Sequence, residues 1–262
     1  MTDLYDEITD EQLERYARHI IMDEVGDLGQ QKLIAAKVLV IGAGGLGSAM
    51  LPYLAASGVG TIGIIDDDVV DLSNLQRQVI HATDDIGANK AENAAKRMRA
   101  INPEITINVY SERINADNAA TIMKSYDIIA DGCDNFSTRL LVSDTAVALQ
   151  KTLVSAALGR FDGQLATFSP HQSTSENALP CYRCFMPQDP GPKAQRSCSD
   201  VGVLSPVAGI IGTMQATEVV KVIMGIGLSL AGKILIFDAL DMRSRVINLP
   251  ADPACPVCGN KK

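Results

Sequence analysis

Four of the six cysteines in the chain are spaced as metal ligands usually are. They form two C-x-x-C pairs, Cys181 with Cys184 and Cys255 with Cys258. Four thiolates can surround a zinc ion as a tetrahedron, which leaves no open position and makes the site structural. A redox role is the alternative, but redox pairs usually open a helix, which neither pair is expected to do here. The spacing therefore predicts a zinc site that ties the middle of the chain to its C-terminal end.

The two other cysteines have different surroundings. Cys198 lies in a polar segment near Arg196, and a neighbouring guanidinium can lower the pKa of a thiol and make it reactive. An inert thiol is also compatible with that position. Cys133 follows a predicted strand and is expected to serve packing.

A glycine-rich loop follows the apolar run 37–41. Gly42, Gly44 and Gly47 fit the pattern G-x-G-x-x-G, with Gly45 in addition. Such glycines allow a tight turn and a close approach of phosphate to the backbone, while the next helix offers free N–H groups to an anion. Asp66 ends the following strand, where a carboxylate can accept hydrogen bonds from ribose hydroxyls. The pattern predicts a nucleotide site without specifying the nucleotide.

Cations beyond the second strand favour a triphosphate. Arg77 and Lys90 can neutralise phosphate charge, which a dinucleotide enzyme does not need at this place. Both side chains could instead be solvated charges on a helix face. The segment that contains Arg77 also offers neutral donors and consists of Ser73, Asn74, Leu75, Gln76 and Arg77.

The fourth predicted strand ends in the run 131–135, with the sequence DGCDN. Carboxyl ends of strands in open α/β sheets line the ligand crevice, and carboxylate oxygens suit Mg²⁺. Asp134 is therefore a candidate magnesium ligand. Asp134 or Asn135 could instead cap the helix that follows, and one residue in each role is also possible.

Alternating strand and helix patterns must position these residues. We expect strands at 37–41, 60–66, 105–110, 127–130 and 152–157, and helices at 10–19, 28–35, 46–57, 89–100, 116–123 and 136–150. This alternation predicts an α/β fold with a doubly wound, mostly parallel sheet. Beyond residue 159 we expect strands at 164–169, 233–239 and 243–249, an irregular segment at 170–206, and a buried helix at 207–224.

Composition excludes several classes of protein. The formal net charge of −8 argues against general nucleic-acid binding, which needs clustered cations. The uncharged stretch 38–65 contains glycines and a proline and changes its period, so we interpret it as strand, turn, helix and strand rather than a membrane span. The N-terminal residues lack the basic and apolar runs of a secretory signal, so we expect a cytoplasmic protein.

These motifs occur together in one order, from Arg18 through the glycine loop and the SNLQR segment to the last C-x-x-C pair. In this combination and order of motifs, the sequence resembles the ThiF/MoeB/HesA family of E1-like adenylyltransferases. It is most similar to the branch that acts on molybdopterin synthase. The resemblance covers about residues 11–259. It implies a Rossmann-like fold with a structural zinc, extended by antiparallel strands. It also implies one domain over 1–262, with N-terminal helices at 1–36, a nucleotide-binding half at 37–158 and a carrier-binding half at 159–262.

The resemblance implies an activity and roles for particular residues. Members of the family use ATP and Mg²⁺ to adenylate the C-terminal Gly-Gly carboxylate of a small ubiquitin-like sulfur carrier. Here the carrier would be MoaD-like, the small subunit of molybdopterin synthase, for molybdenum cofactor biosynthesis, or alternatively the thiamin-pathway carrier ThiS. Arg18 matches an arginine that reaches the partner subunit's ATP site, which implies a homodimer, and Cys198 matches a cysteine that bonds the carrier covalently in some members. The ATP positions are matched by Gly45, Asp66, Ser73 to Arg77, Lys90, Asp134 and Asn135, with Asp134 on magnesium.

One departure and one competing interpretation remain. Some relatives continue into a C-terminal rhodanese domain that this sequence lacks, so sulfur would come from an external donor, a cysteine desulfurase or a rhodanese. The glycine loop and Asp66 alone would also suit an NAD(P)-dependent oxidoreductase. That interpretation assigns no purpose to the cysteine pairs, Arg18, Arg77 or Lys90.

Overall fold

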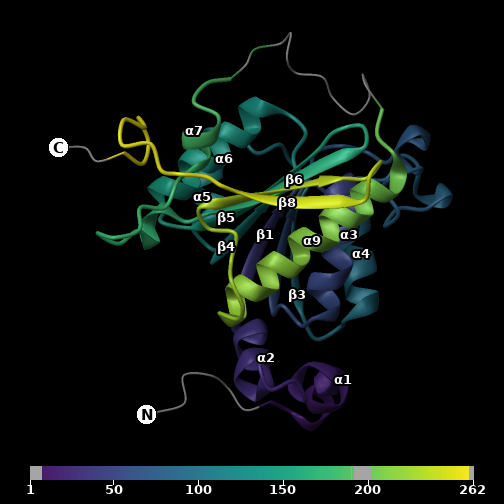
Figure 1. Cartoon of the computed structure of the whole chain (residues 1–262). Helices are drawn as coiled ribbons and strands as arrows, with labels where there is room; N and C mark the ends of the chain where they lie inside the picture. The colour runs from purple at the N-terminus through teal and green to yellow at the C-terminus, as the bar shows by residue number, and fades with distance from the viewer. Residues whose placement is uncertain (1–7, 190, 192–201, 260–262) are drawn as a thin grey trace.

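Eight strands form one mixed sheet in the computed structural model, which describes residues 8–189, 191 and 202–259 (Figure 1). The strand order is β3-β2-β1-β4-β5-β6-β7-β8. The strands are β1 (Lys37–Ile41), β2 (Thr61–Ile65), β3 (Thr106–Tyr110), β4 (Ile128–Asp131), β5 (Thr152–Leu158), β6 (Asp162–Phe168), β7 (Lys233–Asp238) and β8 (Arg243–Asn248). The longer helices are α1 (Asp10–Ile20), α2 (Gly26–Ala35), α3 (Gly45–Ala56), α4 (Lys90–Ile101), α6 (Phe136–Ala148) and α9 (Ser205–Met224), with the shorter α5 (Ala119–Met123) and α7 (Tyr182–Phe185).

The first five strands pair in parallel, as predicted. Their runs are apolar on both faces: Val38 and Val40 face one core and Leu39 and Ile41 the other. Helices therefore cover both faces, with α3, α4 and α9 on one and α5, α6 and α7 on the other (Figure 1). In the sheet, β2 lies beside one edge of β1 and β4 lies beside its other edge. This reversal of strand order places a ligand crevice at the carboxyl ends of β1 and β4.

The last three strands are antiparallel, which confirms the predicted extension of the sheet. β5 and β6 form a hairpin, β7 adds to β6, and β8 forms the edge. Every residue of β8 is exposed.

The long helix α9 is the one described helix that is long and apolar enough to cross a membrane. Half of its most apolar window is buried inside the fold, where it packs against α3 and the sheet, and a core helix of a soluble protein passes the same test. The close approach of the two helices depends on Gly212, because a Cβ there would lie 2.5 Å from the carbonyl oxygen of Leu46.

The starts of α2, α5, β6 and α9 differ from the expectation by two or three residues, and that of α5 has a local reason. α5 begins at Ala119 rather than 116, because the N–H groups of Asn115 and Asp117 donate to the side chains of Asn118 and Asn115 and form a turn instead. Three short 3₁₀ helices lie in predicted loops, Leu72–Asn74, Thr83–Asp85 and Pro170–Gln172.

Candidate nucleotide site and metal centre

The glycine loop joins β1 to the start of α3 and has the backbone that the motif predicts. Gly42 has φ +93°, a value that side chains rarely permit. A Cβ at Gly47 would overlap the carbonyl oxygen of Gly42, so the helix can approach the loop only with glycine there. No side chain of the described chain caps α3 at Gly44. The first N–H groups of α3 therefore remain available for an anion.

Asp66 braces this loop from the end of β2. Its carboxylate accepts the N–H of Ala43 at 2.7 Å and the N–H of Asp68 at 2.9 Å. Burial raises the pKa of Asp66, and these two hydrogen bonds oppose that rise. Each carboxylate oxygen retains a free lone pair, so Asp66 can still accept a hydrogen bond from a ribose hydroxyl.

A second brace, His81, was not singled out from the sequence. Its Nε2 lies 3.1 Å from the carbonyl oxygen of Ala43, and its Nδ1 lies 2.7 Å from the amide nitrogen of Asn93 on α4. This arrangement suits a neutral ring that donates from Nε2 and accepts at Nδ1. Burial lowers the pKa of His81, which favours the same neutral form.

Arg77 lies over the glycine loop. Its Nη1 donates to the carbonyl oxygen of Ser73 at 3.0 Å, and its Cγ would lie 3.9 Å from a Cβ at Gly45. The hydroxyl of Ser205, at the start of α9, hydrogen-bonds the carbonyl oxygen of Gln76 and anchors the segment. Arg77 thus has a fixed stem and lines the cavity described below.

Lys90 is a buried cation at the first turn of α4. Its side chain is 6% exposed, and its Nζ lies 2.9 Å from Oδ2 of Asp68, whose side chain is 67% exposed. Asn89 caps the helix by accepting the N–H of Glu92. A buried ammonium with one solvent-facing carboxylate partner is not a solvated surface charge, so the alternative interpretation of Lys90 is wrong.

The structure separates the roles of Asp134 and Asn135. Asn135 caps α6, since its Oδ1 accepts the N–H of Thr138 at 2.9 Å and the hydroxyl of Ser137 at 3.0 Å. Asp134 is exposed and has no hydrogen bond or ion pair within the described residues. Its carboxylate is therefore available for a cation, and an oxygen donor of this kind fits Mg²⁺.

These side chains surround one cavity of about 370 Å³ at the carboxyl ends of the parallel strands. Of the predicted nucleotide residues, those in the wall are Gly42, Gly44, Gly45, Asp66, Arg77, Lys90, Asp134 and Asn135. Gly47 and residues 73–76 do not line the cavity. Gly47 shapes the glycine loop, and the carbonyl oxygen of Ser73 holds Arg77. The wall also contains residues that sequence reasoning missed, among them Gln78, Arg113 and Arg139. Only Gln78 stood beside a recognised motif.

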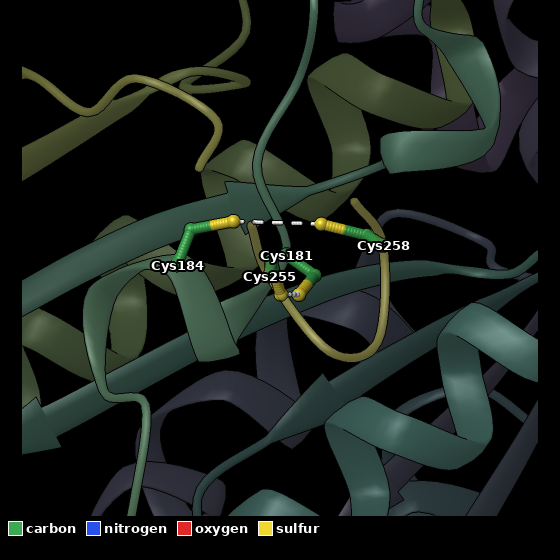
Figure 2. Close-up of side chains that lie close together, drawn as sticks. All are labelled: Cys181, Cys184, Cys255 and Cys258. Atoms are coloured by element: carbon green, nitrogen blue, oxygen red, sulfur yellow. Dashed lines mark hydrogen bonds between the residues drawn. The ribbon is translucent and has the colours of Figure 1, made fainter. Parts of the chain in front are cut away.

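The four paired cysteines converge as predicted (Figure 2). All four sulfurs lie within 4.8 Å of one another, with 3.6 Å between Cys181 and Cys255 and 3.4 Å between Cys184 and Cys258. A tetrahedron with zinc–sulfur bonds of about 2.3 Å has sulfur–sulfur edges of about 3.8 Å, so the donor set fits zinc. The N–H of Asp252 also points at the sulfur of Cys184, 3.3 Å away.

The thiol pKa values reflect the burial and close approach of the four cysteines. Burial and the neighbouring sulfurs raise the pKa of Cys181. Burial raises the pKa of Cys258 to about 12, although its contact with Cys181 opposes that rise. Burial also opposes ionisation of Cys255, but backbone N–H groups of Cys258 and Val257 bring the pKa of its thiol down to about 7. A doubly charged cation at the centre of the four sulfurs would favour all four thiolates.

The expectation that neither C-x-x-C pair opens a helix is wrong. Cys181 is the N-cap of α7, so the first C-x-x-C pair does open a helix, although one of only four residues. The interpretation of the cluster as a structural zinc site depends instead on Cys255 and Cys258, because a redox pair does not need two further cysteines beside it. Cys133 is a half-buried thiol whose pKa burial raises well above its usual value, consistent with packing.

Two predicted residues lie elsewhere. Arg18 is exposed on α1, which docks through Tyr16 against Gly58 and Asn102 at the far ends of α3 and α4. The opposite ends of these helices border the cavity, so Arg18 does not line its own chain's site. Cys198 and Arg196 lie outside the described residues.

The fold and site define a nucleotide-binding α/β protein with a four-cysteine cluster that fits a zinc ion. The model of the ThiF family matches residues 16–257, and the chain belongs to this family. It is 45% identical to the sulfur carrier protein adenylyltransferase of Thermus thermophilus over 97% of this chain and 93% of that one. It is 43% identical to the SAMP-activating enzyme E1 of Haloferax volcanii over 95% and 89% of the two chains. The chain is therefore an E1-like adenylyltransferase, which decides against the oxidoreductase alternative.

Longer relatives and solved structures agree with this assignment. Adenylyltransferase and sulfurtransferase MOCS3 of Xenopus laevis is 44% identical over 97% of this chain, which spans 55% of that protein. The crystal structure of E. coli MccB with ATP superposes with a TM-score of 0.80 at 26% identity, over 94% of this chain and 73% of that one. MccB with MccA-N7isoASN gives a TM-score of 0.82 at 25% identity over 94% and 75%.

Proposed function

We propose that this enzyme adenylates the C-terminal carboxylate of a small ubiquitin-like sulfur carrier. The proposal depends on one observation: a glycine loop, a buried lysine, an arginine and an aspartate line the same cavity. Within the described residues that aspartate has no hydrogen bond or ion pair. This set suits a triphosphate that is attacked at its α-phosphorus. The name of the Thermus thermophilus relative supports a sulfur carrier as the second substrate.

The proposed chemistry depends on positioning and charge. The carrier's carboxylate is already a nucleophile at neutral pH, so the reaction needs no general base. It attacks the α-phosphorus, the bond to the bridging oxygen breaks, and pyrophosphate leaves with that electron pair. Arg77 and Lys90 stabilise the negative charge that moves onto the pyrophosphate. The glycine loop orients the phosphates against the free N–H groups of α3.

Magnesium completes the charge balance in this proposal. Asp134 would hold the ion, which when bound supplies further neutralisation of the triphosphate. Asn135 stays engaged as the helix cap, so Asp134 alone of the pair is free for it.

We propose a MoaD-like carrier, and hence a role in molybdenum cofactor biosynthesis, with the ThiS-like carrier as the alternative. The test is carrier-dependent ATP–pyrophosphate exchange with each purified carrier, and with each carrier lacking its terminal Gly-Gly as the control. Exchange with the intact MoaD-like carrier is the expected result. Exchange with ThiS alone would assign the thiamin pathway, and exchange with neither carrier would refute the proposal.

We further propose a cytoplasmic homodimer that acts as a single domain and receives sulfur from a separate donor protein. Four cysteines placed as metal ligands suit a reducing compartment, where thiols are not consumed in disulfides. The distance of Arg18 from its own cavity supports a site shared between two subunits.

A further inference from the structure

Tyr182 belongs to both the metal centre and the nucleotide cavity. It lies between two of the four clustered cysteines, directly after Cys181, and its side chain is 3% exposed. It also lines the cavity that contains Asp134. Cys181 and Cys184 thus flank Tyr182 in the sequence. Cys255 and Cys258 lie against them and connect this short helix to the C-terminal segment (Figure 2).

The ring of Tyr182 supports a buried guanidinium. The Cζ of Arg139 lies 5.9 Å from the centre of the ring, within cation–π range. Phe168 meets the ring edge-on from β6, with 5.5 Å between the two centres. The Arg139 side chain is 7% exposed and is therefore held by its neighbours rather than by water.

Arg139 in turn holds the backbone just before Asp134. Its Nη2 donates to the carbonyl oxygen of Cys133 at 2.5 Å, and its Nε lies 3.6 Å from Oδ2 of Asp131. The other oxygen of Asp131 accepts the N–H of Cys133 at 2.9 Å. The buried ion pair therefore fixes both polar groups of the Cys133 backbone. Within the described residues Asp134 has no hydrogen bond or ion pair of its own, so these bonds fix the backbone from which its carboxylate extends.

We propose that the metal centre positions the magnesium-binding carboxylate of Asp134 through Tyr182 and Arg139. The proposal rests on the proposed function and deepens it. Tyr182 and Arg139 are positioning residues, and the four-cysteine cluster serves catalysis as well as stability. Within the described residues no hydrogen bond, ion pair or ring contact joins Tyr182 to the glycine loop, Arg77 or Lys90, so we expect the effect at the magnesium end of the site.

The experiment measures ATP affinity calorimetrically with and without Mg²⁺ on zinc-loaded protein, in the absence of any carrier. Tyr182→Leu removes the ring that supports Arg139. It should weaken ATP binding about tenfold in Mg²⁺, about 1.4 kcal/mol, and leave binding in magnesium-free buffer unchanged. Tyr182→Phe keeps the ring and loses only the hydroxyl interaction with Arg139, so it should retain most of the affinity. Phe185→Leu is the matched control, because it removes a ring from α7 that contacts Tyr182, whereas the ring over which Arg139 lies is that of Tyr182.

Zinc removal tests the first link of the chain of contacts. Zinc-stripped wild-type protein should lose ATP affinity in Mg²⁺ as Tyr182→Leu does, and stripping Tyr182→Leu should add no further loss. Additive losses, or equal losses with and without Mg²⁺, would overturn the inference. Arg139→Lys keeps the charge beside Asp131 but loses the donor to Cys133, and it gives the same test if Tyr182→Leu does not fold.

Asp134→Ala separates the two possible failures. If it leaves magnesium-dependent ATP binding intact, the assignment of Asp134 in the proposed function is wrong. If it abolishes that dependence while Tyr182→Leu and Arg139→Lys behave as wild type, the proposed function stands and the positioning role is wrong.

Discussion

Lys90 is expected to be the most sensitive cation of the site, because it is buried and its one carboxylate partner faces solvent. Lys90→Ala should lower kcat/KM for ATP–pyrophosphate exchange by roughly 10²–10³-fold, the usual cost of removing one donor aimed at developing charge. Lys96→Ala is the matched control, since Lys96 is exposed on the same helix. Similar rates for the two variants would remove Lys90 from the mechanism.

His81 should make stability depend on pH. Burial lowers its pKa in the folded state, so on acidification the unfolded chain takes up the proton first. The stability that the neutral ring provides is complete above the unfolded pKa of about 6.5 and is lost as the pH falls toward the folded value. The free energy of unfolding in urea should therefore fall less between about pH 7 and 5.5 in His81→Gln than in wild type. Equal losses in the two proteins would contradict this role.

The roles of individual residues were predictable from the sequence where those residues belong to a recognisable motif. Spacing alone identified the four cysteines, and the structure brings their sulfurs together. His81, Arg139 and Tyr182 were not predictable, because His81 contacts Ala43 and Arg139 contacts Tyr182 across long distances in the sequence. The choice between Asp134 and Asn135 as helix cap also required coordinates, since either residue type can cap.

At the scale of elements, the apolar runs of the parallel strands were the clearest signals. The runs of β1 and β2 are buried as expected, and α1 begins at the expected residue 10, where Thr9 and Gln12 form a capping box. The helix α7 was missed because four residues give no period to detect. It is held by its cysteines and by the packing of Tyr182 and Phe168, which are tertiary effects.

The glycine loop gives a prediction about the strand–loop–helix unit. Gly47→Ala should destabilise the fold and weaken ATP binding, because the new methyl group overlaps the carbonyl oxygen of Gly42. Gly209→Ala is the control within α9, where a Cβ has open space and should stabilise the helix by about 0.5–1 kcal/mol. Urea unfolding and ATP titration measure the two effects. A Gly47→Ala protein as stable as wild type would show that α3 can shift away from the loop.

For the whole molecule, the four cysteines should act as a cross-link between the middle and the end of the chain. Cys258→Ala should lose bound zinc and lower the free energy of unfolding by about 3–4 kcal/mol, a fall in Tm of about 10 °C. Cys133→Ala should keep one equivalent of zinc, because Cys133 is not part of the cluster. Metal analysis with a thermal scan checks both variants, and full zinc content in Cys258→Ala would refute the four-cysteine site.

The long helix α9 sets the distance between the two ends of the molecule. Its first residue bonds the segment that carries Arg77, while Lys32 of α2 donates to the carbonyl oxygen of Met224 at its other end. Twenty residues of helix span about 30 Å. The N-terminal helices, which pack at the far end (Figure 1), therefore hold Arg18 away from its own cavity. If Arg18 takes part in the reaction, it must do so in another subunit.

Subunit complementation tests this shared site. Arg18→Ala and Lys90→Ala should each be inactive alone, because every site then lacks one cation. Mixed in equal amounts, half of the dimers contain one of each subunit and one complete site of two, so about a quarter of wild-type exchange should return. Mixing Arg77→Ala with Lys90→Ala is the control, since both residues line the same chain's cavity and each subunit's site then lacks a cation of its own. Recovery in the first mixture alone would place Arg18 in the partner's site, and failure of both mixtures to recover would contradict the shared site.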